Sequence, residues 1–294
     1  MDPGEQYAFL EHSLGSILSQ RALIRLTGED RLEWLQGQAT NDVNRLSEGS
    51  VSYCLCSPTG QMEAVVDAWA LDDCILLSTD LECAPAVMRR IERMVIMEDV
   101  EGEDLTPNLR LTRLVGAGTP DTSGAEYVLQ SGHFIDVWGG TDASNYPDVG
   151  EAFEAWRLER GIPLWGVDMG LKTLPPELGP AFEASHVSYT KGCYTGQEIL
   201  QRIHSRGHTN WTWAGLIADG PLEVGSTVDH ESRAGAGTIT SSALSPKLGH
   251  IAAARLRNEV AVEGTRVRIA GVAAVVRPMP LLTPARRLSS SPSR

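Results

Sequence analysis

Eight consecutive residues about two thirds of the way along the chain have the composition of a reactive site. Residues 191–198 read Lys-Gly-Cys-Tyr-Thr-Gly-Gln-Glu. They set the thiol of Cys193 beside a lysine and between two glycines, which allow close approach of the backbone and positive φ angles. A neighbouring ammonium group raises the thiolate fraction of a cysteine. We therefore predict that Cys193 is a reactive thiol, with Lys191 and Tyr194 beside it.

The other cysteines have different surroundings. The chain contains Cys54, Cys56, Cys74, Cys83 and Cys193, an odd number without a C-x-x-C pair. A disulfide framework or a four-cysteine zinc site is therefore not expected, and we predict no metal site. Cys54, Cys56 and Cys74 lie in apolar, strand-like stretches and are predicted to be small buried hydrophobic residues.

A single acidic residue stands out in a predicted helix over residues 151–160, which Gly161 ends. Glu159 falls three residues after Trp156 and so shares a side of the helix with an apolar neighbour. A carboxylate in such a place needs a partner. The planar pair of N–H donors on a pterin ring is one candidate, and a nearby arginine is the other. The pattern leaves both open.

Residues 37–42 read Gly-Gln-Ala-Thr-Asn-Asp and form a polar link after a predicted short helix. Asn41 and Asp42 commonly form turns by hydrogen bonds from side chain to backbone. Turns of this kind also form the walls of many binding sites. Both interpretations remain open for this segment.

Composition excludes several classes of function. The chain has 294 residues, 42% of them apolar, and a net charge of −13 from 38 acidic and 25 basic residues. This acidic excess argues against general binding to nucleic acid. No apolar run reaches about 18 residues, so no membrane span is expected. The acidic N-terminus lacks the apolar region of a signal peptide, and we expect a cytoplasmic protein.

The pattern of the first half predicts strands around a few helices. A strand over 21–26 precedes a helix that Asp30 caps, with Leu32 and Leu35 facing the core and Gly37 at its end. A second helix is predicted from Pro85 to Met97. Several strands around so few helices predict an α+β sheet that is packed on one face. The other predicted strands are residues 51–56, 62–71, 74–78, 109–115, 126–130 and 133–137.

From Trp211 onwards the pattern changes to short strands with frequent glycine, which is typical of a small β-barrel or sandwich. These strands are predicted at residues 211–217, 236–240, 250–256, 266–269 and 272–276. Residues 283–294, rich in serine, are predicted to be a disordered tail.

The segment 191–198 also resembles the K-G-C-[FY]-x-G-Q-E signature of YgfZ-type folate-binding proteins, which are relatives of the aminomethyltransferase of the glycine cleavage system. Gln201-Arg202 extends this highly specific match. Three further blocks are shared more widely across the aminomethyltransferase superfamily. They are residues 26–42, with L-Q-G-Q-A-T-N-D, residues 157–163, with R-L-E-R-G-I-P, and residues 237–246, with G-T-I-T-S and S-P.

The resemblance implies an α+β, three-part fold with two α+β parts around a central folate pocket and a C-terminal β-barrel. Residues 1–50 and 139–208 would form a discontinuous folate-binding domain. Residues 51–138 would form a ferredoxin-like subdomain, residues 209–282 the barrel, and residues 283–294 the tail.

The resemblance also assigns roles to residues. It implies that Glu159 is the pterin-binding carboxylate, and that Cys193, Lys191 and Tyr194 are functional residues beside the pocket. The further ligand contacts that it implies are Asn41, Asp42, Gln197, Glu198 and Arg202.

The implied ligand is tetrahydrofolate or a derivative, and the implied partners are iron–sulfur proteins or their assembly factors. Family members are implicated in making or maintaining iron–sulfur enzymes, and some bacterial members affect tRNA modification through such enzymes. The acidic charge of this chain agrees with an indirect role, without direct contact to nucleic acid.

One departure from true aminomethyltransferases bears on the alternative functions. Those enzymes carry a catalytic aspartate just before a helix of the middle sheet, where this chain has Ala84, with Asp80 and Glu82 nearby. A classical aminomethyltransferase is therefore not expected. A folate-dependent one-carbon transferase or demethylase is the rival function, and an interaction scaffold without a ligand is the third.

Overall fold

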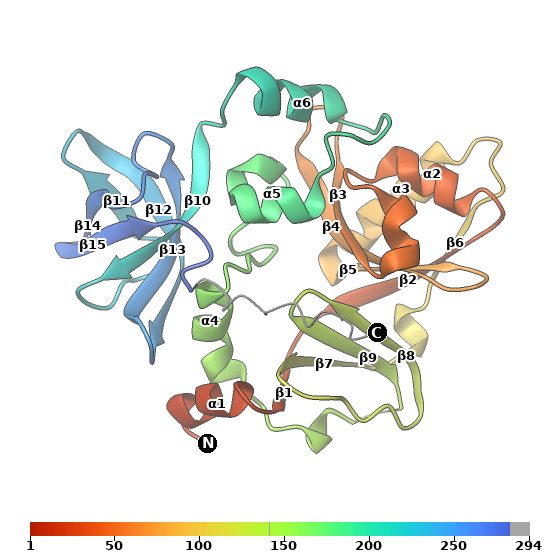
Figure 1. Ribbon diagram of the computed structural model, residues 1–294, viewed down its shortest axis with the longest axis horizontal. Coiled ribbons are helices and arrows are strands. Elements are labelled where there is room, and N and C mark those ends of the chain that lie inside the picture. The colour runs from red at the N-terminus through yellow and green to blue at the C-terminus, as the bar shows by residue number, and fades with distance from the viewer. Residues whose placement is uncertain (141, 283–294) are drawn as a thin grey trace, which may run out of the picture.

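Three antiparallel sheets carry the fold of the computed structural model, which describes residues 1–140 and 142–282 (Figure 1). The predicted α+β class and the predicted C-terminal barrel are confirmed. Figure 1 shows the barrel on one side, the two open sheets on the other, and helices α4 and α5 between them. The predicted tail at residues 283–294 lies outside the described residues.

The larger open sheet has the strand order β3-β4-β5-β2-β6. One face packs on helices around Ile24, Tyr53, Val66 and Ile91, which are at most 5% exposed. Its elements are β2 (Arg21–Thr27), α2 (Arg31–Gln38), η1 (Val43–Glu48), β3 (Val51–Cys56), β4 (Met62–Ala70), β5 (Ile75–Asp80), η2 (Leu81–Cys83), α3 (Ala84–Met94) and β6 (Glu101–Asp104).

The smaller open sheet has the order β1-β7-β9-β8 and packs on α1 and α4 through Tyr7, Leu10 and Trp156. Helix α1 begins with a capping box in which Asp2 and Glu5 exchange hydrogen bonds with each other's backbone. The elements of this part are α1 (Pro3–Leu10), β1 (Leu14–Ile17), η3 (Thr106–Asn108), β7 (Leu111–Gly116), β8 (Ala125–Ser131), β9 (Phe134–Gly139), η4 (Ala143–Asn145) and α4 (Gly150–Glu159).

Strand pairing does not follow the predicted division at residues 50 and 138. Strand β2 lies outside the predicted subdomain, yet it pairs with β5 and β6 in the larger sheet. Strands β7 to β9 lie inside it, yet they form the smaller sheet with β1. Both sheets therefore combine N-terminal strands with later ones, because antiparallel partners can be distant in sequence.

The C-terminal strands close into a barrel in the order β10-β13-β12-β11-β14-β15, which removes exposed strand edges. Its interior holds Leu216, Val228, Ile239 and Leu256, each at most 1% exposed. The strands are β10 (Trp211–Ala218), β11 (Thr227–His230), β12 (Arg233–Ser245), β13 (Gly249–Arg257), β14 (Arg266–Ile269) and β15 (Val272–Arg277). Helices η5 (Pro175–Leu178), α5 (Pro180–His186) and α6 (Gln197–Arg206) precede the barrel.

Local details of the helices correct some predictions and confirm others. Asp30 precedes α2 without capping it, because its carboxylate accepts the backbone N–H of Asp99. Leu32 is 40% exposed, and Trp34 packs with Leu35 in its place. Helix α2 continues through the predicted end at Gly37, and α3 ends at Met94, three residues before the predicted end. Helix α4 ends just before Gly161, which has φ +65°, as predicted.

Candidate functional site

A cavity of about 370 Å³ lies where the two open sheets, α5 and the segment 160–165 meet. Strands β2 to β5 form one wall, and the tip of the β8–β9 hairpin forms another. The lining residues that carry the chemistry are Arg21, Ser52, Asp67, Asp80, Arg113, Ser131, His133, Arg160 and His186, with Phe134, Trp165 and Phe182 as apolar surface.

Strand register builds the polar wall of this cavity. Ser52 of β3 is the direct cross-strand partner of Asp67 in β4. The hydroxyl groups of Ser52 and of Ser131, at the end of β8, both donate to Asp67 Oδ1, over 2.6 and 2.7 Å. Arg21 Nη2 donates to Asp67 Oδ2 over 2.9 Å. The carboxylate thus joins three strands from two sheets.

Asp67 remains ionised because its partners outweigh its burial. Its side chain is only 13% exposed, and burial alone would raise its pKa. The Arg21 guanidinium and the two hydroxyl donors hold the pKa of Asp67 below its usual value. Arg21 also lies 3.4 Å from Asp80, which is 31% exposed and therefore the more accessible carboxylate of the wall.

A second buried ion pair lies at the β8–β9 hairpin, whose tip forms another wall of the cavity. Arg113 Nε of β7 lies 2.9 Å from Asp136 Oδ1 of β9, and its guanidinium lies 4.0 Å from the ring centre of Phe134. Burial raises the pKa of Asp136 and lowers that of Arg113. The pair ties the hairpin to β7 close to the tip that carries Ser131.

Two histidines in the cavity wall are neutral near pH 7. His186 Nδ1–H donates to the carbonyl of Phe182 over 3.0 Å, and the two rings stack with their centres 3.8 Å apart. That bond leaves Nε2 as an acceptor. Burial lowers the pKa of His186, and burial together with Arg160 lowers the pKa of His133. Arg160 stacks at 4.2 Å on Trp156 and is 27% exposed.

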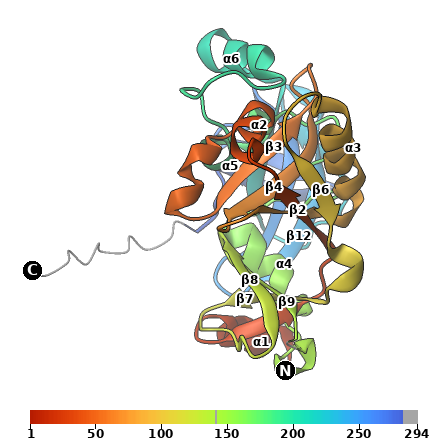
Figure 2. The ribbon, with the colours of Figure 1, turned by 90° about the vertical axis from the view of Figure 1, so that its right-hand side faces the viewer.

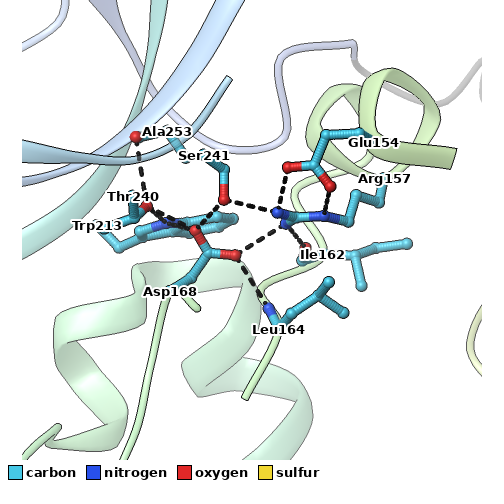
Figure 3. A network of polar contacts seen from close by, with 9 residues as sticks. All are labelled: Glu154, Arg157, Ile162, Leu164, Asp168, Trp213, Thr240, Ser241 and Ala253. Atoms are coloured by element: carbon cyan, nitrogen blue, oxygen red, sulfur yellow. Dashed lines mark hydrogen bonds and ion pairs between the residues drawn. The ribbon is translucent and has the colours of Figure 1, made fainter. Parts of the chain in front are cut away.

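A buried ion pair ties α4 to the barrel (Figure 3). Arg157 and Asp168 have fully buried side chains, and Arg157 Nη1 donates to Asp168 Oδ2 over 2.8 Å. Arg157 also binds Glu154 of its own helix and the Ser241 hydroxyl of β12. Each charge is therefore compensated, as a buried charge must be.

The same pair holds the segment 160–165 of the cavity wall. Arg157 Nη1 donates to the carbonyl of Ile162 over 2.9 Å, and Asp168 Oδ2 accepts the backbone N–H of Leu164 over 3.0 Å. Asp168 Oδ1 accepts hydrogen bonds from Trp213 and Thr240 of the barrel. The barrel thus positions one wall of the cavity without lining it.

Glu159 is fully buried but does not belong to the cavity wall. Its carboxylate accepts hydrogen bonds from the hydroxyl groups of Tyr7 in α1 and Ser245 at the end of β12. Arg160 Nη1 lies 3.8 Å away. Burial and the Glu159 carboxylate raise the pKa of Tyr7, so its hydroxyl stays a donor. Helix α4 directs Glu159 towards α1 and the barrel, so the carboxylate predicted to bind the pterin lies outside the lining of this cavity.

Lys191 holds the end of α2 instead of the thiol. Its Nζ donates to the backbone carbonyls of Gln36, Ala39 and Asn41, over 2.6, 2.6 and 2.9 Å. These bonds use all three donors of the ammonium group. Burial lowers the pKa of Lys191 to about 8. Lys191 therefore forms a structural clamp between the signature and residues 36–41, and its activation of Cys193 stays a prediction.

Cys193 is exposed and lies outside the cavity wall, whereas the four other cysteines are buried. Tyr194 is buried at 7% exposure, and burial raises its pKa. Its hydroxyl has no hydrogen-bond partner within residues 1–140 and 142–282. Gly196 has φ +86°, and a Cβ there would lie 2.6 Å from the carbonyl of Ser57. The signature loop therefore packs against the β3–β4 turn, and the thiol of Cys193 is exposed to solvent.

Asn41 and Asp42 form a turn that contacts elements of the cavity wall without lining the cavity. Asn41 Nδ2 donates to the carbonyls of Ser52 and Ser185, so it ties β3 to α5. Asp42 accepts the backbone N–H of Asn44 and caps η1. Of the two open interpretations, the turn is the one observed, and neither residue lines the cavity.

The remaining predicted contacts lie on α6, away from the cavity. Glu198 and Arg202 are exposed, and together with Gln197 they line a shallow groove on the outer side of this helix. Ala84 is buried in the first turn of α3 and does not line the cavity either. Although position 84 carries an alanine and not a carboxylate, the cavity wall contains the carboxylates of Asp67 and Asp80.

Sequence reasoning missed the cavity residues themselves. Arg21, Asp67 and Arg113 of the cavity wall, and Asp136 that pairs with Arg113, are charged residues within strands that are otherwise largely apolar and buried. Charged side chains in such strands are costly unless they are paired, so they mark candidate sites. Among the described residues, no group of three or more His, Cys, Asp or Glu is placed to hold a metal ion. Nor is any described helix long and apolar enough to cross a membrane.

The fold is that of an aminomethyltransferase. The crystal structure of the glycine cleavage system aminomethyltransferase T from Bartonella henselae superposes with a TM-score of 0.80. The match covers 95% of this chain and 89% of that chain at 19% sequence identity. The predicted three-part architecture is therefore confirmed.

Sequence similarity narrows the class. The chain is 24% identical over 238 residues to the tRNA-modifying protein YgfZ of Hamiltonella defensa, covering 70% of this chain and 69% of that protein. It is 23% identical over 222 residues to the human mitochondrial iron–sulfur cluster assembly factor IBA57, covering 65% and 62%. A putative chloroplastic transferase of Arabidopsis thaliana is 23% identical over 307 residues, covering 90% and 70%. No protein-family model matches. The predicted resemblance to YgfZ-type proteins is confirmed.

Proposed function

We propose that this protein binds tetrahydrofolate or a derivative in the central cavity and acts in the cytoplasm as an accessory factor for iron–sulfur enzymes. An effect on tRNA modification would follow indirectly, through such enzymes. The observation that carries the proposal is a cavity of about 370 Å³ with a buried polar wall in a fold shared with an aminomethyltransferase. Cavities of this size, with a few convergent polar groups, are typical of small-molecule sites.

The chemistry of the cavity suits a reduced folate. Asp67 and Asp80 offer acceptors for the N–H groups of a pterin ring. Phe182 and Trp165 offer flat apolar surface, and Arg160 at 27% exposure suits the carboxylates of a glutamate tail. In this proposal the pterin-binding carboxylate is one from the larger sheet and not Glu159.

Similarity to YgfZ and to IBA57 supports the iron–sulfur part of the proposal. The net charge of −13 supports a role without direct contact to RNA. We propose that the exposed Cys193 meets an iron–sulfur partner at the surface as a transient iron ligand. A single cysteine does not hold a cluster, which usually needs four ligands.

Ligand binding is tested by anaerobic calorimetric titration with tetrahydrofolate. Wild type is expected to bind saturably, and Asp67→Asn and Arg160→Ala are each expected to raise the Kd about tenfold or more. Arg202→Ala is the matched control, because this exposed arginine lies on α6 outside the cavity and should leave the Kd unchanged. Absence of saturable binding, or equal effects of Arg160→Ala and Arg202→Ala, would refute the cavity as the folate site.

The cellular role is tested in cells that lack this protein. A [4Fe–4S] enzyme is assayed under oxidative stress after complementation with wild type or with Cys193→Ala. Wild type is expected to restore activity, and the variant is expected to fail although it folds and binds tetrahydrofolate normally. Unchanged enzyme activity on deletion would sink the accessory role, and full rescue by Cys193→Ala would remove the thiol from the mechanism.

A folate-dependent transferase or demethylase is the second candidate, and the two carboxylates of the cavity wall favour it. Asp80, at 31% exposure, is accessible to a bound ligand. The test is turnover: the purified protein is incubated with tetrahydrofolate and an aminomethyl donor, or with an N-methyl donor and a two-electron acceptor, because oxidation of an N-methyl group to the methylene level releases two electrons. Formation of methylenetetrahydrofolate that Asp80→Asn abolishes would favour this candidate, and saturable binding without turnover would exclude it for the donors tried.

A further inference from the structure

Three apolar side chains stand out in solvent beside the larger open sheet. Helix α3 ends at Met94, which is 42% exposed, and the loop beyond it presents Ile96 at 82% and Met97 at 93% exposure. Figure 2 views the molecule from this side, with α3, α2 and β6 towards the viewer. We refer to Met94, Ile96 and Met97 as the apolar knob.

The loop that carries the knob is fixed by hydrogen bonds. Glu98 Oε2 accepts the backbone N–H groups of Ile96 and Met97 over 2.9 and 3.0 Å, and these bonds lower the pKa of Glu98. The N–H of Asp99 donates to Asp30 Oδ2 over 2.8 Å. A loop that is already ordered loses little conformational entropy when it binds a partner.

Folding of the loop does not require the two exposed side chains. Val95 packs on the core of the larger sheet, and Trp34 Nε1 donates to the carbonyl of Met94 from below. The hydrogen bonds that hold the loop use backbone groups of Ile96 and Met97, so polar side chains at these positions would leave the bonds intact. Exposed apolar side chains on an ordered loop are typical of interaction sites.

An acidic strip lies beside the knob, on the edge strand β6 and the turn before it. Glu103 pairs with Arg25. The other four carboxylates of the strip have no cationic partner in the part of the chain that the structure describes. They belong to Glu98, Asp99, Glu101 and Asp104. Charged side chains on an edge strand also prevent that edge from pairing with the sheet of another molecule. This protection would explain the acidic strip, but it does not explain the exposed apolar side chains of the knob.

We infer that the knob and the acidic strip together form a docking surface for a protein with an apolar pocket bordered by lysine or arginine side chains. Four uncompensated carboxylates repel nucleic acid and anionic lipid, whereas they attract a basic protein surface. Methionine suits such a pocket because its flexible side chain adapts to irregular shapes. The class of partner, an iron–sulfur protein or assembly factor, rests on the proposed function.

Contact is tested by site-specific cross-linking in cells. A photoreactive phenylalanine replaces Met97, and the same group at Leu18, which is 96% exposed on another turn, is the control. One adduct is expected from position 97, with a protein of the iron–sulfur class, through a peptide that contains Lys or Arg. Glu101→Lys in the same chain is expected to lower its yield about tenfold.

The functional readout is rescue of the [4Fe–4S] enzyme by the double variant Ile96→Ser/Met97→Ser. Rescue is expected to be lost while tetrahydrofolate affinity and thermal stability are unchanged, and Leu18→Ser is expected to rescue fully. Full rescue by the double variant would overturn the docking surface. The docking surface would also be overturned if the adduct at position 97 were no stronger than the adduct at position 18. An adduct formed with a second copy of this chain would overturn it as well.

Failure of the proposed function can be distinguished from failure of the docking surface. If wild type itself does not restore the iron–sulfur enzyme, the accessory role fails, while the comparison of positions 97 and 18 still decides whether this surface contacts a protein.

Discussion

Ser52 and Asp67 face each other across β3 and β4, and the Ser52 hydroxyl donates to Asp67 Oδ1 over 2.6 Å. Ser131, from the other open sheet, donates to the same oxygen over 2.7 Å. One carboxylate oxygen thus links the two sheets at the wall of the cavity. The cavity depends on this link, because the hairpin that carries Ser131 belongs to a different sheet from Asp67.

Loss of either hydroxyl should weaken the link measurably. Ser52→Ala and Ser131→Ala are each expected to lower the free energy of unfolding by about 1 kcal/mol, since a buried acceptor loses one donor. The two effects should not add, because both hydroxyls serve the same oxygen. Urea unfolding of the two single variants and the double variant measures this. Ser205→Ala, on the exposed side of α6, is the control, and strict additivity would contradict the shared role of Asp67.

Removal of a charge from the network of Figure 3 should lower the free energy of unfolding more than the loss of either serine hydroxyl. Asp168→Asn is expected to cost about 3 kcal/mol or more of unfolding free energy, because it removes the fully buried charge that faces Arg157 and leaves this buried arginine paired with the 36% exposed Glu154. It should also weaken tetrahydrofolate binding, since Asp168 holds the cavity segment at Leu164. Glu154→Gln, at a 36% exposed partner of the same arginine, should cost less than about 1 kcal/mol. Equal costs for both would argue against the buried pair as the anchor.

The clamp formed by Lys191 predicts a structural defect from a signature substitution. Lys191→Met is expected to lower the free energy of unfolding by about 2–4 kcal/mol, because three backbone carbonyls lose their donor. Lys172→Met, at an exposed lysine, should change it by less than about 0.5 kcal/mol. Thermal and urea unfolding of both variants compare the two lysines. A Lys191→Met protein of wild-type stability would return Lys191 to the role of a functional group for Cys193.

Stability is expected to fall in mild acid because of the cavity histidines. Burial lowers the pKa of His186 and His133 from 6.5, so in the folded state they resist protonation. Below pH 6.5 the unfolded chain binds protons that the folded chain does not, and the free energy of unfolding decreases as the pH falls. Above pH 6.5 both states are neutral at these sites and the contribution is constant.

Urea unfolding at pH 7.5 and pH 5.5 measures this dependence. The double variant His133→Gln/His186→Gln is expected to show a smaller loss between the two pH values than wild type. An unchanged difference would mean that other groups set the acid sensitivity.

Local sequence determined much of the secondary structure. Residues 211–217 and the later short strands alternate as barrel strands do, and helix α4 ends before Gly161 because a positive φ favours glycine there. The signature at residues 191–198 was sufficient to indicate the YgfZ-type relatives, and burial of Cys54, Cys56 and Cys74 followed from their apolar neighbours. Each of these depends on residues close together in the chain.

Only the tertiary structure decided which residues meet. Asp67, Ser131 and Arg21 converge through strand pairing across two sheets, which no local pattern encodes. The structure also turned Glu159 towards Tyr7 and Lys191 towards the backbone of residues 36–41. Spacing along the chain sets the face of an element that a side chain occupies, but the packing of that face against distant elements sets its partner.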